Sequence, residues 1–283
     1  MYFTIEEIKK FDFDGKSICF RSKDKKFDKI IENLNPVDFR DVSSRLVSFW
    51  KENKRPIALK YLTRICNDNK IERLNIRSIS VNGGNQLIFP EENNPKLYYL
   101  LGLILGDGCL CYKNKFQNGG SYRLQITVRY KKEVHQIRNL IKDLFNIDSS
   151  FYKDKGCYNV CTFSKVLVIF LNKIYDIPIG KKHKHMKVPI AVKKDKVYIK
   201  YFLKGLFDSD GNIYKHRNSE CLQIRQKSKS FIEEIQLLLK IVGIEIGGPY
   251  YDKANGSTLL WSSKKETLDR FKNEINVIMF EPL

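Results

Sequence analysis

The chain has 283 residues, of which 42% are hydrophobic and 12% are aromatic. This composition supplies enough apolar surface for buried cores and excludes a globally disordered protein. The 51 Lys and Arg residues outnumber the 32 Asp and Glu residues and give a formal net charge of +19. An excess of this size favours a polyanionic partner, either nucleic acid or an anionic membrane surface. The alternative explanation is a lysine-rich composition that only keeps the protein soluble.

The sequence contains no targeting or membrane signal. Its first residues, MYFTIEEIKKF, lack the apolar core of a signal peptide. The longest apolar run, Leu97 to Leu105, is far shorter than the ~20 residues that cross a bilayer. The seven Cys residues have no convincing zinc-site spacing. We therefore expect a cytoplasmic protein with reduced cysteines and no membrane partner.

Residues 1–92 are predicted to form a small, mainly helical N-terminal domain. Thr4 and Glu7 have the spacing of a capping box at a first helix, and Pro56 fits the first turn of a later helix. Two neighbouring helices suggest an accessory DNA-binding domain of the helix-turn-helix kind, and a packing extension is the alternative. The apolar positions of these two helices are Phe39, Val42, Leu46 and Phe49, then Tyr61, Leu62 and Ile65.

A short motif follows and occurs twice. Residues 98–110 read YYLLGLILGDGCL, an apolar helical pattern that ends in a carboxylate, and residues 201–213 read YFLKGLFDSDGNI. Aligned on the final Asp-Gly, the copies run L-L-G-L-I-L-G-D-G and L-K-G-L-F-D-S-D-G, with Asp107 and Asp210 103 residues apart. Internal similarity of this kind indicates a repeated structural unit.

The segments after the two motifs are also alike. Residues 123–147 and 221–244 each combine a strand-like alternation with a helical period. Each repeat therefore predicts helix, two strands, helix, two strands, helix, and the fold class is α+β with two pseudo-symmetric αββαββα repeats. We assign residues 93–178 and 201–283 to the repeats. Residues 179–200, which include His183 and His185, are interpreted as an exposed basic linker and not as a metal site.

Small residues in the motifs predict close packing of two helices. Gly102 and Gly106 share one helix face, as do Gly205 and Ser209. Because small residues allow two helix backbones to approach closely, the two motif helices are expected to pack on these faces. Their C-termini would then lie side by side.

Each motif helix is expected to end on an acidic residue, although the helix macrodipole disfavours a carboxylate there. Asp107 and Asp210 occupy this position, and Gly108 and Gly211 fit the left-handed cap that ends a helix. Paired carboxylates with nearby main-chain oxygens suit a hard cation such as Mg²⁺ or Mn²⁺. Such ions activate water and stabilise the leaving oxygen of a phosphodiester.

Two predicted strands carry similar polar faces. In each strand the apolar residues alternate with Arg, Lys, Gln or Thr, the side chains that contact base edges and phosphates. Together with the charge, this favours DNA as the partner. The predicted DNA-binding residues are Arg123, Gln125, Thr127 and Arg129 in the first repeat, and Gln223, Arg225 and Lys227 in the second.

The two motifs and the pattern around them resemble the LAGLIDADG homing endonucleases, specifically the monomeric two-motif kind. The resemblance runs from about residue 93 to the end and implies a saddle of two β-sheets that lies in the DNA major groove. It also implies that Asp107 and Asp210 bind the catalytic metal. The main-chain carbonyls of Gly106 and Ser209 are implied as further ligands.

The resemblance also implies an amide and a basic residue at the end of the second strand of each repeat. Gln226 and Lys227 match this pattern in the second repeat, whereas Val128 and Arg129 stand in the first. The amide is therefore missing from the first repeat, and Arg is a poor proton acceptor. We expect the two strand cleavages to be unequal for this reason. The other departure, Leu105, stands where the second copy has Asp208 and is expected to be tolerated.

The resemblance implies a site-specific endonuclease that acts in intron mobility. It would make double-strand breaks in DNA at a long recognition site and leave 3′ overhangs. The alternatives are a maturase that binds intron RNA and a DNA-binding regulator that does not cleave. We expect a monomer. The family also includes self-splicing inteins, but the chain lacks an N-terminal nucleophile and a terminal His-Asn, so a free-standing protein is expected.

Overall fold

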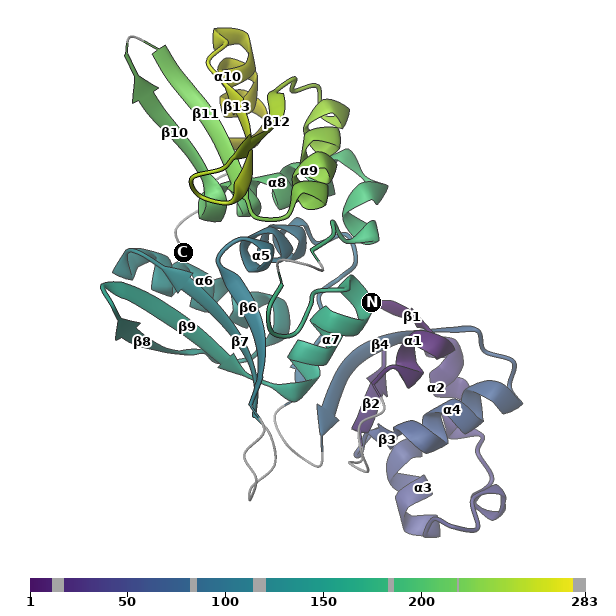
Figure 1. Ribbon diagram of the computed structural model, residues 1–283. Helices are drawn as coiled ribbons and strands as arrows, with labels where there is room; N and C mark the ends of the chain where they lie inside the picture. Colours follow the sequence, from purple (N-terminus) through teal and green to yellow (C-terminus); the bar gives the residue numbers. More distant parts are fainter. Residues whose placement is uncertain (12–17, 82–85, 114–120, 183–185, 218, 277–283) are drawn as a thin grey trace. The chain divides into compact units, whose positions relative to one another are not determined.

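The computed structural model describes residues 1–11, 18–81, 86–113, 121–182, 186–217 and 219–276. The chain divides into two compact units (Figure 1). One comprises Met1–Asn93 with Asp143–Ile147, and the other comprises Asn94–Lys142 with Asp148–Leu283. Among the described residues, no helix has the length and hydropathy that a membrane crossing requires.

The N-terminal unit is built around a five-stranded sheet of order β1-β4-β2-β3, with β5 paired to β4. The helices α1, α2 and α3 begin at polar caps, as in α1, where Thr4 and Glu7 form the predicted capping box. Its strands are β1 (Tyr2–Thr4), β2 (Ile18–Ser22), β3 (Ile57–Ala58), β4 (Arg73–Val81) and β5 (Leu87–Ile88). Its helices are α1 (Ile5–Lys9), α2 (Lys25–Glu32), the 3₁₀ turn η1 (Pro36–Asp38), α3 (Ser44–Lys51) and α4 (Leu59–Asp68).

The sheet was not part of the prediction of a mainly helical domain. The sequence signal was weak because β3 and β5 have two residues each and β4 buries Ser78 and Ser80 beside its apolar side chains. The expected helices exist, but α4 begins after Ala58 and not at Pro56. The strand β3 lies between α3 and α4 and pairs with β2, so their connection is not the 3–4-residue turn of a helix-turn-helix motif.

The second unit contains the two repeats in the predicted order. The first consists of α5 (Pro95–Leu105), β6 (Gly108–Lys113), β7 (Ser121–Val128), α6 (Lys131–Phe145), β8 (Ser150–Asp154), β9 (Cys157–Phe163) and α7 (Lys165–Tyr175). The second consists of α8 (Lys196–Asp210), β10 (Gly211–His216), β11 (Ser219–Gln226), α9 (Lys229–Ile241), β12 (Gly247–Asp252), β13 (Ser257–Ser262) and α10 (Lys265–Phe271), followed by the π-helical turn η3 (Lys272–Asn276). The α+β fold class is confirmed.

Each repeat forms a four-stranded antiparallel sheet with the same strand order. The first sheet runs β6-β7-β9-β8 and the second runs β10-β11-β13-β12. One face of each sheet is apolar and buried, as Leu124 and Ile126 are in β7 and Leu222 and Ile224 are in β11. Because side chains alternate along a strand, the opposite face of each sheet carries the polar residues predicted to bind DNA.

The segment between the repeats is only partly the exposed linker that its lysines suggested. Met186, Val188 and Val192 are buried, a 3₁₀ turn, η2 (Ile190–Lys194), follows, and α8 already begins at Lys196. The apolar residues interspersed among the lysines explain the difference. His183 and His185 lie outside the described residues.

Candidate active site

The two motif helices pack against each other through glycine. A Cβ atom added at Gly102 would overlap the carbonyl oxygen of Phe202 and lie 2.7 Å from the backbone nitrogen of Leu206. A Cβ atom added at Gly205 would likewise overlap the carbonyl oxygen of Tyr99. Glycine is therefore required at both positions, and the predicted backbone-to-backbone packing of α5 and α8 is confirmed.

This packing places the C-terminal ends of α5 and α8 side by side. A Cβ atom added at Gly106 would overlap the Ser209 hydroxyl and lie 2.9 Å from Oδ2 of Asp210. Asp107 follows Gly106 directly, at the start of β6, whereas Asp210 is the last residue of α8. The two motifs thus bring their acidic residues to one place, from different repeats.

The predicted left-handed glycine caps are wrong. Gly211 has φ −94° and ψ 158°, which is extended backbone, and it begins β10. Gly108 pairs with Ile126 in the first sheet, and it is required for another reason. A Cβ atom there would lie 2.6 Å from Cα of Ile104. Each glycine thus stands where its motif passes from helix to strand, and not at a left-handed cap.

Asp210 is the more perturbed of the two carboxyl groups. Gln226 Nε2 donates a hydrogen bond to Oδ2 of Asp210, which joins two residues that the sequence had predicted for the site. Desolvation and the nearby charge of Asp107 raise the pKa of Asp210 to about 7, against the opposing effects of Lys182 and Gln226. Desolvation also raises the pKa of Asp107, although the residue keeps an exposed surface. Two carboxyl groups held this closely favour a bound cation or a shared proton.

Lys182 is a site residue that the sequence analysis missed. Its ammonium donates to the carbonyl oxygens at the end of α5, those of Leu105 and Gly108 at 2.8 Å each and those of Ile104 and Gly106. Burial lowers its pKa, and the negative charges of Asp210 and Asp107 oppose that effect. A fixed positive charge therefore lies at the negative end of α5, beside both carboxylates.

The carboxyl pair predicts a pH dependence of stability in the absence of divalent metal. Because the folded-state pKa of Asp210 is about 7 and its ordinary value is 3.8, the folded protein binds more protons than the unfolded chain between these values. The free energy of unfolding should therefore fall as the pH rises from about 4 to about 7. Denaturant unfolding across this range should show the decline. The Asp210→Asn variant should lack most of it, and an equal slope in the variant would contradict the assignment.

The basic residues at the strand ends are exposed. Arg129 and Lys227 follow the last residues of β7 and β11 and are exposed. The Arg129 guanidinium lies 5.7 Å from the ring centroid of Tyr130. In the first repeat, Val128 stands where the second repeat has Gln226, so the amide that contacts Asp210 has no equivalent beside Asp107. The asymmetry expected from the sequence is thus present in the structure.

The open face of the first sheet carries a neutral hydrogen-bonded network. On the first sheet, Gln125 Nε2 and Thr127 Oγ1 both donate to Asn159 Oδ1, each at 2.8 Å. The thiols of Cys109 and Cys111 lie 3.2 Å apart on the same face. The remaining predicted DNA-binding side chains, Arg123, Gln223 and Arg225, are half-buried on the open faces of the two sheets.

The donor set at the motif junction fits a hard divalent cation. Asp107, Asp210 and the main-chain oxygens of Gly106 and Ser209 are the oxygen ligands that Mg²⁺ and Mn²⁺ prefer. Within the described ranges, no three His, Cys, Asp or Glu side chains lie close enough together to hold a metal ion. Further ligands would therefore come from water and from a phosphate, and the Gly106 carbonyl is shared with Lys182.

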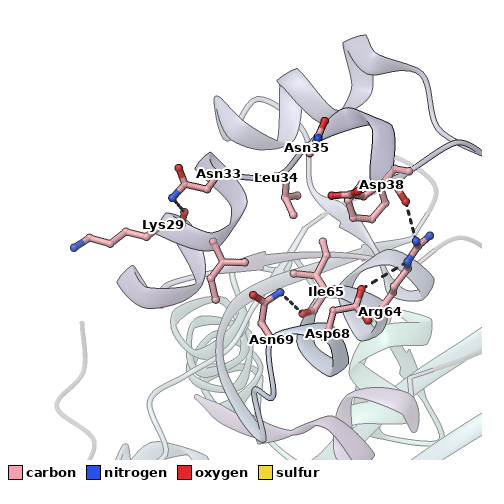
Figure 2. Close-up of a pocket in the computed structure, with 11 residues that line it drawn as sticks. Lys29, Asn33, Leu34, Asn35, Asp38, Arg64, Ile65, Asp68 and Asn69 are labelled. Carbon is pink, nitrogen blue, oxygen red and sulfur yellow. Dashed lines mark hydrogen bonds and ion pairs between the residues drawn. The ribbon is translucent and has the colours of Figure 1, made fainter.

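A separate concavity of about 570 Å³ lies in the N-terminal unit (Figure 2). Several of its polar side chains donate to main-chain carbonyl oxygens. Arg64 donates to the carbonyl oxygen of Asp38 at 2.8 Å and lies 3.8 Å from the Asp68 carboxylate. Asn33 and Asn69 donate to carbonyl oxygens at the ends of α2 and α4. This arrangement stabilises two helix ends and contains no catalytic pair.

Comparison with known proteins shows which family the second repeat resembles. Residues 198–276 match the family model of the LAGLIDADG-like domain. The matched segment lies in the second repeat. The fold is similar to that of I-DmoI in complex with DNA and Mn, with 23% identity, a TM-score of 0.52, and coverage of 66% of this chain and 98% of that chain. I-DmoI in complex with DNA and Ca gives 22% identity, a TM-score of 0.53, and coverage of 65% and 91%. The resemblance to LAGLIDADG homing endonucleases is confirmed at the level of the fold.

Curated relatives match this chain over a stretch within much longer chains. The chain is 26% identical over 199 residues to glutamine–fructose-6-phosphate aminotransferase of Methanocaldococcus jannaschii, covering 68% of this chain and 17% of that protein. It is 26% identical over 176 residues to elongation factor 2 of Methanopyrus kandleri, covering 62% and 12%. The chain thus spans less than a fifth of the length of these relatives. Because proteins with such different names share the stretch, it is not tied to any one of their activities.

Proposed function

We propose that the protein is a divalent-metal-dependent DNA endonuclease that cuts both strands of a long target site. The observation that carries this proposal is the junction of the two motifs, where Asp107 and Asp210 from different repeats meet beside Lys182. A protein that only binds DNA has no use for two crowded carboxylates, because they repel phosphate. The occurrence of similar stretches in proteins of unrelated activities supports a role in a mobile element.

The charge and the sheets support duplex DNA as the substrate. A net charge of +19 favours binding to the phosphate backbone. The open faces of β7 and β11 carry Gln, Thr and Arg, whose side chains can hydrogen-bond to base edges in the major groove. Figure 1 shows the two sheets with α5 and α8 beside them. We infer a monomer, since one chain supplies both motifs.

The chain's own residues have distinct tasks at the junction. Asp107 and Asp210 would hold Mg²⁺ or Mn²⁺, which supplies charge neutralisation at the phosphate and lowers the pKa of bound water. Gln226 holds the Asp210 carboxylate in place. Lys182 balances the negative charge of the site.

Lys227 and Arg129 are proposed to contact the phosphates near the cleaved bonds. Both are exposed, at the ends of β11 and β7. Their charges would stabilise the pentacovalent transition state once DNA is bound. Because the amide is absent from the first repeat, we propose that the two strands are cut at unequal rates.

The N-terminal domain, residues 1–92, is proposed as an accessory DNA-binding element. Around α3, the guanidinium groups of Arg45 and Arg55 lie 5.6 and 5.3 Å from the ring centroid of Phe49. Both arginines are exposed, and such side chains commonly bind the phosphate backbone. For the remaining domains, the sequence predicted 93–178 and 201–283 for the repeats and 179–200 for the linker. Because α8 begins at Lys196, we propose 93–178 and 196–283 for the repeats and 179–195 for the linker.

The proposed cleavage is tested with a plasmid library that carries random or genomic inserts. Wild-type protein and Mg²⁺ should linearise the plasmids that contain a target, and sequencing of the ends should show short 3′ overhangs. A maturase without nuclease activity or a DNA-binding regulator would give no linear product. Retained binding to library DNA without linear product in Mg²⁺ or Mn²⁺ would reject the endonuclease.

Replacement of Lys182 by Met should destabilise the metal-free protein. The change leaves partly buried carbonyl oxygens of α5 without a donor, which costs about 1–3 kcal/mol. Denaturant unfolding in EDTA measures the difference. The matched control is Lys181→Met, since Lys181 is the exposed neighbour, and this variant should stay within about 0.5 kcal/mol of wild type. Equal stability of the two variants would show that the contacts of Lys182 are dispensable.

A further inference from the structure

An ion pair on the open face of the second sheet restrains one of the predicted DNA-binding side chains. Arg225 Nη1 lies 2.5 Å from Asp252 Oδ2 and 3.2 Å from Ser257 Oγ. Asp252 ends β12 and Ser257 begins β13, and the two residues are paired across the strands. Arg225 is therefore held at the end of a hairpin, on the face opposite the buried Leu222 and Ile224.

Asp252 is itself fixed by the hairpin turn. Its carboxylate accepts hydrogen bonds from Ala254 N at 3.0 Å and from Asn255 Nδ2 at 2.8 Å. The hydrogen bonds from Asn255 and Arg225 lower the pKa of Asp252 to about 2, so the group is ionised at neutral pH. The exposed fractions of the Arg225 and Asp252 side chains are 36% and 22%. A guanidinium is thus presented to solvent in one orientation.

The geometry points to Asp252 as the positioning residue that orients Arg225 to read a guanine in the major groove. This inference rests on the proposed function for its DNA substrate. A guanidinium has five N–H donors in a planar fork, and the contacts to Asp252 and Ser257 both use Nη1. These contacts leave the donors on Nε and Nη2 for a ligand, and guanine presents two acceptors, N7 and O6, at the spacing of this fork.

The first repeat presents a different group at the matching position. In the aligned strands L-Q-I-T and L-Q-I-R, Thr127 corresponds to Arg225. The Thr127 hydroxyl donates to Asn159 and belongs to a neutral network with Gln125. We therefore expect the guanine contact only in the half of the DNA target that the second repeat binds. The two half-sites should differ at the base pair that Arg225 contacts.

The inference is tested by binding selection from a random duplex library in Ca²⁺, with retained DNA sequenced for wild type, Arg225→Ala and Asp252→Asn. Wild type should select guanine at one position of the half-site bound by the second repeat. Arg225→Ala should reduce the preference for that base by on the order of ten- to a hundredfold. Asp252→Asn should weaken the same preference and leave the others unchanged, because the free guanidinium samples more orientations.

A matched control removes an ion pair from the other face of the same strand. Glu220 of β11 pairs with Lys272 at 2.6 Å, and Glu220→Gln should leave base selection unchanged. An unaltered profile in Arg225→Ala would overturn the guanine contact, and an altered profile in Arg225→Ala alone would overturn the positioning role of Asp252. Since the readout is binding, these failures are distinct from absent cleavage, which would reject the proposed nuclease.

Discussion

Substitution of either Asp107 or Asp210 by Asn should abolish cleavage of both DNA strands. The two carboxylates meet at one junction, and each would supply a charged ligand to the same metal site. Loss of a metal ion that contributes several kcal/mol of transition-state stabilisation slows the reaction by about a thousandfold or more. Single-turnover assays on a duplex with each strand labelled measure the two rates separately.

Asp208→Asn is the matched control for this experiment. Asp208 belongs to the same motif, but its carboxylate accepts a hydrogen bond from Tyr99 OH at 2.9 Å and pairs with Lys204. The first repeat has Leu105 at the corresponding position, so cleavage does not require a carboxylate there. The Asp208 variant should therefore still cut both strands. If it lost cleavage as completely as the Asp107 and Asp210 variants, the assignment of the metal ligands would be wrong.

Replacement of Gly102 or Gly205 by Val should destabilise the two-repeat unit by about 3 kcal/mol or more. The added Cβ would overlap the carbonyl oxygens of Phe202 or Tyr99 in the facing helix. Those oxygens belong to helical backbone and cannot rotate away as a side chain could. The helices would have to separate, which would also move the two acidic residues apart. Thermal or denaturant unfolding gives the change in stability.

A glycine in open space provides the comparison. Gly256 lies in the turn between β12 and β13 with φ +56°, and an added Cβ would meet no atom within 4 Å. Asn tolerates this backbone conformation, so Gly256→Asn should cost less than about 1 kcal/mol. Similar losses at Gly102 and Gly256 would mean that close helix packing is not what requires glycine in the motifs.

The repeated motif made the carboxylate pair predictable. One Asp at a helix end has several explanations, but a second copy with the same small residues four positions apart indicates two helices that meet. The order of helices and strands along each repeat and the helix packing followed from that symmetry. Gln226 could be assigned for the same reason, because its place in the second strand is defined relative to the motif.

Lys182 could not be found in this way. It lies far from both motifs in the sequence, among other lysines, and only the folded chain places its ammonium at the end of α5. The sheet of the N-terminal unit was missed because β3 and β5 have two residues each and β4 buries serine. Gly108 was correctly expected to be required. The expected reason was a left-handed cap, whereas the structure shows a close approach to Ile104.

The most direct test of the central claim is anomalous diffraction from crystals of the protein bound to its selected DNA with Mn²⁺. We expect an anomalous peak between the carboxylates of Asp107 and Asp210, next to a phosphate of the target. Mn²⁺ bound only elsewhere, with these two carboxylates making no contact to it, would contradict their assignment as the metal ligands.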